Sequence, residues 1–159
     1  MKQTVYIETT IPSSYHDVRP EPEMVARQHW TRQWWDGRRD RHALFTSAAV
    51  LDELRRGGHP GQDRKLALLE GLPLLEITRE VVEIAEVYIE RYVMPSDPAG
   101  DALHLALATF YKMDVLLTWN CEHLANENKM THIRRTNALM GLWTPDIVTP
   151  LNLLGEHGE

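Results

Sequence analysis

Four residues carry side-chain oxygens that a folded chain could bring together as ligands: Glu8, Glu53, Asp101 and Asn120. Glu8 follows an apolar strand-like run, Asp101 opens an apolar helix-like run, and Asn120 closes a second strand-like run. Carboxylates that gather in one place repel each other unless a cation neutralises them. Mg²⁺ or Mn²⁺ would do so, because these hard ions prefer oxygen ligands. Such an ion can activate a water and stabilise the charge on a phosphate during hydrolysis.

Two consecutive segments are expected to position Asp101 and Asn120. Residues 100–108 are almost wholly apolar after Asp101, which predicts a buried helix. Residues 114–120 form a continuous Val/Leu run that ends in polar residues, which predicts a buried parallel strand. The helix and the strand run in opposite directions, so the first turn of the helix lies near the last residue of the strand. We therefore expect the carboxylate and the amide at the carboxyl edge of a sheet, the usual ligand position in open α/β folds.

Strands and helices alternate along the rest of the chain. We predict further strands at 5–7, 43–46, 74–77 and 146–149, and further helices at 21–39, 48–56, 61–70, 78–92, 120–126 and 131–140. Ser47 and Thr78 are predicted N-caps, and residues 11–14 are predicted to form a loop. This order predicts an α/β fold whose parallel sheet is covered on both faces. We expect one domain over residues 1–154 and a flexible tail over 155–159.

Composition limits the possible classes of protein. The chain has 159 residues with 43% hydrophobic and 25% charged residues, which fits one ordinary globular domain. No apolar run approaches the ~20 residues that span a bilayer, and no signal-peptide pattern is present, so we expect no membrane association. A single cysteine, Cys121, favours a reducing cytoplasm. The net charge of −6 argues against a broad basic surface for duplex nucleic acid, although a local basic patch remains open.

The chain resembles the PIN-domain ribonucleases, and in particular the VapC-type toxins of bacterial toxin–antitoxin pairs. The segments that carry this resemblance are Val5 to Thr10, Ser47 to Gly57, Asp101 to Ala106 and Leu117 to Asn120, and together they cover nearly the whole chain. The resemblance implies a three-layer α/β/α sandwich with a central parallel sheet of about five strands. It also implies an endoribonuclease that hydrolyses RNA phosphodiesters with Mg²⁺ or Mn²⁺, forms a homodimer and is blocked by a cognate antitoxin.

The family pattern carries over to the four candidate residues with two departures. Glu8 stands where the family usually has Asp, and Asn120 stands where Asp is frequent. Both substitutions keep an oxygen ligand, but one lengthens the side chain and the other removes a charge. The resemblance implies that Glu8, Glu53 and Asp101 ligate the ion and that Asn120 positions a water or a second ion. It also selects Glu53 over its neighbour Asp52, since adjacent helical residues cannot both face the site.

Several of these residues also have a purely structural explanation. An acid such as Asp101 is stabilised in a first helical turn by the helix dipole, and Asn120 is a favoured N-cap residue. Thr9 and Thr118 are either ordinary strand residues or hydroxyls that orient the carboxylates. We expect His104 to be a hydrogen-bonded core histidine and Cys121 to be an inert small hydrophobe.

Basic and aromatic residues provide candidate contacts with partners. Arg55 and Arg56 either hold RNA phosphates or belong to a solvated helix face. Trp30, Trp34 and Trp35 carry more aromatic surface than a small domain can leave in water, so we expect part of it to be buried between subunits.

Two rival functions remain open at this stage. The first is a catalytically impaired PIN scaffold that binds RNA or a protein partner without cleaving. The second is an unrelated doubly wound protein that binds a small phosphorylated ligand. Residues 8–12 lack the Gly-rich turn that such proteins usually carry after the first strand, which disfavours the second rival.

Overall fold

A computed structural model describes residues 2–95 and 100–156 of the chain. The strands are β1 (Gln3–Ile7), β2 (His42–Ser47), β3 (Leu74–Leu75), β4 (Val115–Leu117) and β5 (Asp146–Val148). The α-helices are α1 (Thr10–Tyr15), α2 (Pro22–Arg38), α3 (Ala48–Arg55), α4 (Gln62–Leu68), α5 (Arg79–Glu90), α6 (Asp101–Phe110), α7 (Glu127–Met140) and α8 (Pro150–Glu156). Two short 3₁₀ turns, η1 (Arg39–Arg41) and η2 (Arg56–Gly58), flank β2 and α3. Within the described residues, no helix is both long enough and apolar enough to cross a membrane.

The strands form one parallel sheet in the order β3-β2-β1-β4-β5. The predicted α/β fold with about five parallel strands is therefore confirmed. Residue Tyr6 of β1 pairs with Phe45 on one side and with Leu116 on the other. The chain order reverses at β1, because β2 and β3 extend the sheet in one direction and β4 and β5 in the other. Open parallel sheets bind ligands at the carboxyl ends of the strands beside such a switch point.

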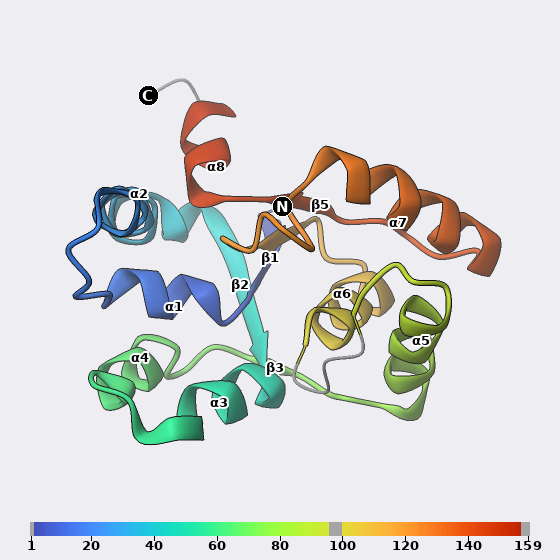
Figure 1. The fold of residues 1–159 in the computed structure, drawn as a ribbon, viewed down its shortest axis with the longest axis horizontal. Helices are drawn as coiled ribbons and strands as arrows, with labels where there is room; N and C mark the ends of the chain where they lie inside the picture. Colours follow the sequence, from blue (N-terminus) through green and yellow to red (C-terminus); the bar gives the residue numbers. More distant parts are fainter. Residues whose placement is uncertain (1, 96–99, 157–159) are drawn as a thin grey trace.

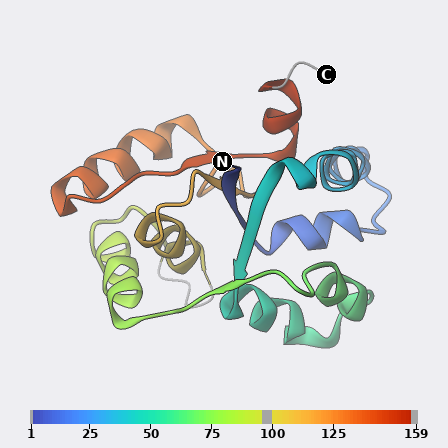
Figure 2. The same ribbon diagram turned by 180° about the vertical axis from the view of Figure 1, so that it is seen from behind.

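Helices cover both faces of the sheet and make the three layers (Figure 1). Helices α1, α2 and α8 lie on one side, and α5, α6 and α7 lie on the other, as the view from behind also shows (Figure 2). Helices α3 and α4 lie near β3, at the other end of the sheet from α7 (Figure 1). This is the α/β/α arrangement that the sequence predicted.

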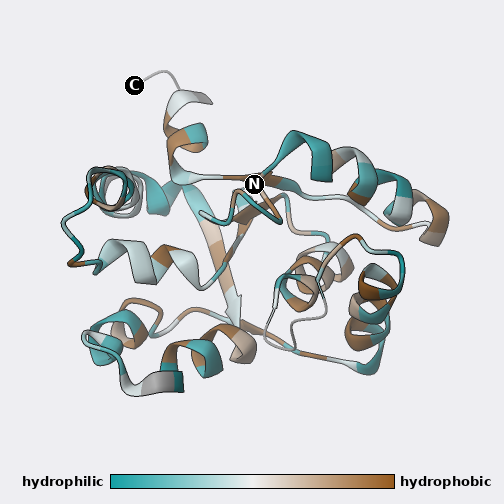
Figure 3. Cartoon of the chain, viewed as in Figure 1, coloured by the Kyte–Doolittle hydropathy of each residue, from teal (hydrophilic) through white to brown (hydrophobic). Residues whose placement is uncertain are grey.

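The central elements are apolar on all sides because helices cover them from both faces. Val5, Tyr6 and Ile7 of β1 are fully buried, and α6 buries seven of its ten residues. Figure 3 shows hydrophobic residues along β1 and α6, whereas much of the outer helix α7 is hydrophilic. Burying each large apolar side chain contributes roughly 1.5–3 kcal/mol, so this centre is rigid enough to fix polar groups at its edge.

Two segment predictions are wrong in a way that affects the site. Residues 11–14, predicted to form a loop, lie in the short helix α1, which starts two residues after Glu8. Residues 121–124 are a hydrogen-bonded turn where we predicted a short helix. The next helix, α7, begins at Glu127 under an Asn126 cap, four residues earlier than predicted. In both places the local propensity was weak, and tertiary context can override weak propensity.

At the carboxyl end of the chain, α8 extends to Glu156 and so includes two residues of the expected tail. The rest of that tail, residues 157–159, lies outside the described residues. The flexibility of residues 155–159 stays a prediction.

The tryptophan expectation also needs correction. Trp34 and Trp35 are buried in the chain's own core, with exposed fractions of 0% and 2%, and their rings meet edge to face at 6.2 Å. Trp30 is partly buried against the same core. The aromatic surface of α2 therefore gives no reason to expect burial between subunits.

Candidate metal and nuclease site

The register of the two central strands places Glu8 beside Thr118. Ile7 pairs with Leu117, and the Glu8 amide donates to the Leu117 carbonyl at 3.3 Å. Glu8 is only 3% exposed. Its Oε1 atom accepts hydrogen bonds from the Thr10 amide at 3.0 Å, the Thr10 hydroxyl at 2.5 Å and the Thr118 hydroxyl at 2.8 Å. Burial raises the pKa of the Glu8 carboxyl, although the His104 charge and these hydrogen bonds act to lower it.

Thr118 therefore holds the Glu8 carboxylate, as one of the two readings of this residue predicted. Thr9 does not, because within the described part of the chain its buried hydroxyl has no hydrogen-bond partner. Thr10 takes that role, which the sequence did not predict because it gave no sign of a helix beginning at Thr10. The backbone of α1 turns the Thr10 amide and hydroxyl back toward the end of β1.

Asp101 and Asn120 meet as the opposite directions of α6 and β4 predicted. Asn120 Nδ2 donates to Asp101 Oδ1 at 2.8 Å. Asn120 Oδ1 accepts from the His123 amide at 3.0 Å, so the residue also caps the turn that follows β4. Burial raises the pKa of Asp101, the charges of His104 and His123 oppose that shift, and the charge of Glu53 adds to it. The amide thus holds the carboxylate and orders the turn at once.

Glu53 approaches the site from α3 and is held by a histidine. Its Oε1 atom lies 2.5 Å from His104 Nε2, and the other ring nitrogen of His104 lies 2.8 Å from the Tyr6 hydroxyl. The Tyr6 hydroxyl lies 2.7 Å from Ser47 Oγ. Ser47 occupies the predicted N-cap position of α3, but its hydroxyl joins this chain of contacts and makes no capping hydrogen bond.

His104 is the hydrogen-bonded buried histidine that we expected, but its partners belong to the candidate site. Burial alone would lower its pKa, yet the hydrogen bond to Glu53 and the charges of Glu8, Glu53 and Asp101 outweigh burial and raise it. A sequence signal existed, since a lone imidazole one turn after Asp101 interrupts an otherwise apolar helix.

The neighbours of Glu53 are solvated. Asp52 is exposed and pairs at 3.7 Å with Arg55, which is exposed as well. Arg56 begins η2 and is also exposed. Of the two adjacent acids it is therefore Glu53 that faces the site, and Arg55 and Arg56 lie on the surface beside α3. Cys121 is exposed at the turn after Asn120.

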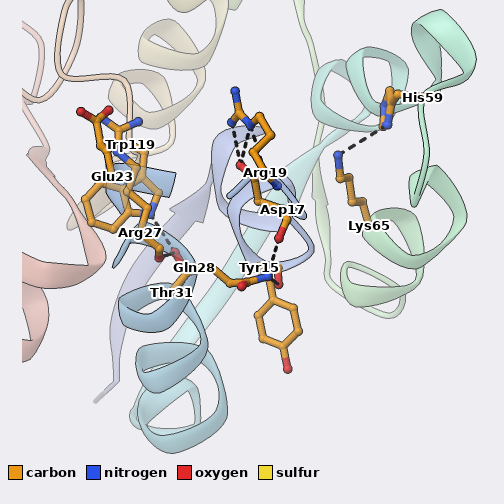
Figure 4. A network of polar contacts seen from close by, with 10 residues as sticks. All are labelled: Tyr15, Asp17, Arg19, Glu23, Arg27, Gln28, Thr31, His59, Lys65 and Trp119. Atoms are coloured by element: carbon orange, nitrogen blue, oxygen red, sulfur yellow. Dashed lines mark hydrogen bonds and ion pairs between the residues drawn. The ribbon is translucent and has the colours of Figure 1, made fainter. Parts of the chain in front are cut away.

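Trp119 joins this edge of the sheet to α2. Its amide donates to the Thr10 hydroxyl at 2.8 Å, and its indole N–H donates to the Thr31 hydroxyl at 2.8 Å. Figure 4 shows the indole against Arg27, whose guanidinium carbon lies 5.3 Å from the ring centre. The ring of Trp30 stacks on the Trp119 indole, with ring centres 6.1 Å apart. These contacts hold the start of α1 and the end of β4 in one position, and with them the three donors to Glu8.

The charges of Glu8, Glu53 and Asp101 thus all act on His104, and Asn120 holds Asp101. Their donor chemistry and charge fit a hard divalent cation, because buried carboxylates with raised pKa values are destabilised by their own charge. Among the residues that the structure describes, however, no three acidic, histidine or cysteine side chains are arranged to hold one metal ion. Metal binding would require some of these side chains to exchange protein hydrogen bonds for the ion.

Comparisons with known proteins agree with this architecture. The family model of the PIN domain matches residues 5–121, a range that contains all four candidate residues. The fold also matches a chain from "Crystal structure of VapBC2 from Rickettsia felis bound to a DNA fragment from their promoter". That match has a TM-score of 0.54 and 12% sequence identity, and covers 92% of this chain and 98% of the other. At such low identity the likeness concerns the fold alone. No curated protein matches the sequence.

Proposed function

Because the chain belongs to the PIN domain family, we propose that it is a metal-dependent endoribonuclease and the toxin of a toxin–antitoxin pair. PIN domains are generally nucleases and typically use divalent metals. The observation that carries the proposal is that Glu8, Glu53 and Asp101 all lie near enough to the buried His104 for their charges to raise its pKa. Carboxylates that cost free energy to bury are retained where they serve a function.

In this proposal Glu8, Glu53 and Asp101 hold Mg²⁺ or Mn²⁺. The ion, when bound, would lower the pKa of a water and stabilise negative charge on the phosphate. Thr10 and Thr118 keep the Glu8 carboxylate in place. Asn120 holds Asp101 through its amide N–H. The RNA phosphodiester would be cleaved by hydrolysis, without a covalent enzyme intermediate.

The proposed partners follow from the family and from the VapBC2 match. We propose a cognate antitoxin that covers the site, a homodimer and a cytoplasmic location, where RNA is accessible. Arg55 and Arg56 are our candidates for contacts with RNA phosphates, because both are exposed beside the helix that carries Glu53.

A cleavage assay with a labelled single-stranded RNA tests the enzymatic part. We expect cleavage with Mn²⁺ by the wild type, none in chelator, and a loss of at least about a hundredfold in Asp101→Ala. Asp52→Ala is the matched control, because it removes an exposed acid next to Glu53 and should cleave as the wild type does. Equal cleavage by Asp101→Ala would refute the proposed site.

One observation favours the alternative of a PIN scaffold that binds RNA without cleaving it. The Asn120 oxygen is already engaged by the His123 amide, so this position offers less to an ion than the Asp frequent in the family. RNA binding by the wild type that persists in chelator, with no cleavage at any Mn²⁺ concentration, would favour this alternative.

A further inference from the structure

The side chain of Glu53 needs an external constraint to act in the site. It projects from the middle of α3, and its side chain is 22% exposed, unlike the buried Glu8. A glutamate with that freedom populates several rotamers, and fixing one of them costs conformational entropy. Within the described part of the chain, its one hydrogen bond is to His104 Nε2. The orientation of Glu53 therefore depends on that imidazole.

His104 is itself held rigidly. It is 1% exposed on α6, one turn after Asp101, and its Nδ1 atom lies 2.8 Å from the hydroxyl of the fully buried Tyr6. That hydroxyl lies 2.7 Å from Ser47 Oγ. The chain of contacts starts at Glu53 on α3, crosses α6 and β1, and returns to the residue that precedes α3. The contacts thus close a ring that ties α3 to the two elements carrying Asp101 and Glu8.

The ring has a consistent set of donors and acceptors. With a neutral imidazole, Ser47 donates to the Tyr6 oxygen, Tyr6 donates to Nδ1, and Nε2–H donates to the Glu53 carboxylate. Each of these three hydrogen bonds then has one proton. One carboxylate oxygen of Glu53 remains without a hydrogen bond to any described residue. Supporting hydrogen bonds of this kind orient metal-ligating side chains, and their loss typically costs 10–100-fold in metal affinity or activity.

We propose that His104 is the positioning residue of the site: it fixes Glu53 toward Asp101 and leaves one carboxylate oxygen free for the cation. Tyr6 and Ser47 fix the imidazole in turn. This inference rests on the proposed function for its metal, but the contact between His104 and Glu53 can be tested without one.

The first part of the test is an NMR measurement on the metal-free protein. We expect an imidazole Nε2–H proton of His104 that is shifted downfield and protected from exchange in the wild type and lost in Glu53→Ala. Glu53 is partly exposed, so this variant should fold. If the proton is absent in the wild type or unchanged in Glu53→Ala, the inference is wrong.

The second part compares Mn²⁺ affinity in two variants that each keep half of the imidazole's contacts. His104→Gln can still donate to Glu53, whereas His104→Asn places its amide near Tyr6 and does not reach Glu53. We expect Mn²⁺ affinity about tenfold lower in His104→Asn and nearer the wild type in His104→Gln. A merely structural role would lower the melting temperature of both variants without this difference in affinity.

Controls separate the outcomes. His132→Asn changes an exposed histidine on α7 and should leave Mn²⁺ affinity unchanged. If both His104 variants fail to fold, Tyr6→Phe replaces them, and a lower Mn²⁺ affinity is expected because Nδ1 loses its partner. Wild-type affinity in His104→Asn, or in Tyr6→Phe when it stands in, would overturn the inference. A wild type that shows the protected proton but takes no Mn²⁺ would refute the proposed metal dependence and support the positioning of Glu53.

Discussion

Adjacent threonines at the start of α1 have opposite surroundings. The Thr10 hydroxyl donates to Glu8 and accepts from the Trp119 amide, whereas the Thr9 hydroxyl is buried without a hydrogen-bond partner in the described residues. A buried hydroxyl is costly where it is unpaired and valuable where it pairs with a charge. The two positions therefore allow a matched comparison of nearly isosteric substitutions.

We predict that Thr10→Val lowers the free energy of unfolding by about 1–3 kcal/mol, because it removes one of the three hydrogen bonds to the buried Glu8 carboxylate and leaves the Trp119 amide without its partner. Thr9→Val should change it by less than about 0.5 kcal/mol or raise it, since no hydrogen bond is lost. Urea unfolding at pH 7 in chelator measures both. Equal losses in the two variants would contradict the role given to Thr10.

The second prediction at the residue scale concerns Asn120. Asn120→Asp replaces the N–H that donates to Asp101 with a second negative charge, but keeps an oxygen for the His123 amide. We expect a loss of about 1–3 kcal/mol in chelator from the lost hydrogen bond and the repulsion. Mn²⁺ should restore this stability by binding the folded state.

Thermal melts with chelator and with Mn²⁺ check this outcome. Asn120→Ala should lose ribonuclease activity as well, because Asp101 would no longer be held. If Asn120→Asp melts at one temperature under both conditions, Asn120 only caps the turn, and the proposed site contains three residues.

At the scale of the elements, α2 is a core helix and not an exposed aromatic face. Trp34 packs on Trp35 at 6.2 Å and on His42 of β2 at 5.5 Å between ring centres. The helix also receives the Trp119 indole at Thr31. It therefore stabilises the layer that supports α1 and the donors to Glu8.

We predict that Trp34→Ala lowers the free energy of unfolding by about 3–5 kcal/mol, the usual cost of such a cavity. The mass of the remaining folded fraction in sedimentation should match that of the wild type. Val25→Ala, at a half-exposed position of the same helix, should stay within about 0.5 kcal/mol. A Trp34→Ala protein that is stable but has a smaller assembly would restore the subunit-interface explanation.

At the scale of the whole molecule, the site makes the metal-free fold less stable at neutral pH. Burial raises the pKa of both Glu8 and Asp101 above their unfolded values, so the folded state binds protons more tightly than the unfolded state. The contribution of these groups is fully present below the unfolded pKa values near 4 and is lost as pH rises through the folded values. An acidic chain of net charge −6 adds its own repulsion at neutral pH.

We therefore predict that Glu8→Gln, which cannot ionise, is more stable than the metal-free wild type at pH 7.5 and gains nothing at pH 4. A gain of about 1 kcal/mol would raise the melting temperature by about 2–4 °C in a protein of this size. Melting curves from pH 4 to pH 8 in chelator measure it, with Asp52→Asn as the exposed control. A Glu8→Gln protein less stable than the wild type at pH 7.5 would show that the three hydrogen bonds outweigh burial.

The sequence by itself determined the features that depend on short-range pattern. Continuous apolar runs predicted β1, β4 and α6, and the alternation of strands and helices predicted the parallel sheet. The meeting of Asp101 and Asn120 followed from these elements, because a helix and the strand after it run in opposite directions. The Thr78 cap of α5 was also local, since its hydroxyl accepts from the Val81 amide three residues on.

Only the tertiary structure decided which polar side chains support the acids. Ser47 was predicted to cap α3, but its hydroxyl contacts Tyr6 instead. Thr9 was one candidate to orient Glu8, but the hydroxyl that does so belongs to Thr10. His104 contacts Glu53 and Tyr6, which lie 51 and 98 positions away from it in the sequence. No local spacing encodes such contacts. The tryptophans of α2 show the same limit, since their aromatic surface predicts burial but only the packing of distant elements decides whether this chain or a second subunit covers it.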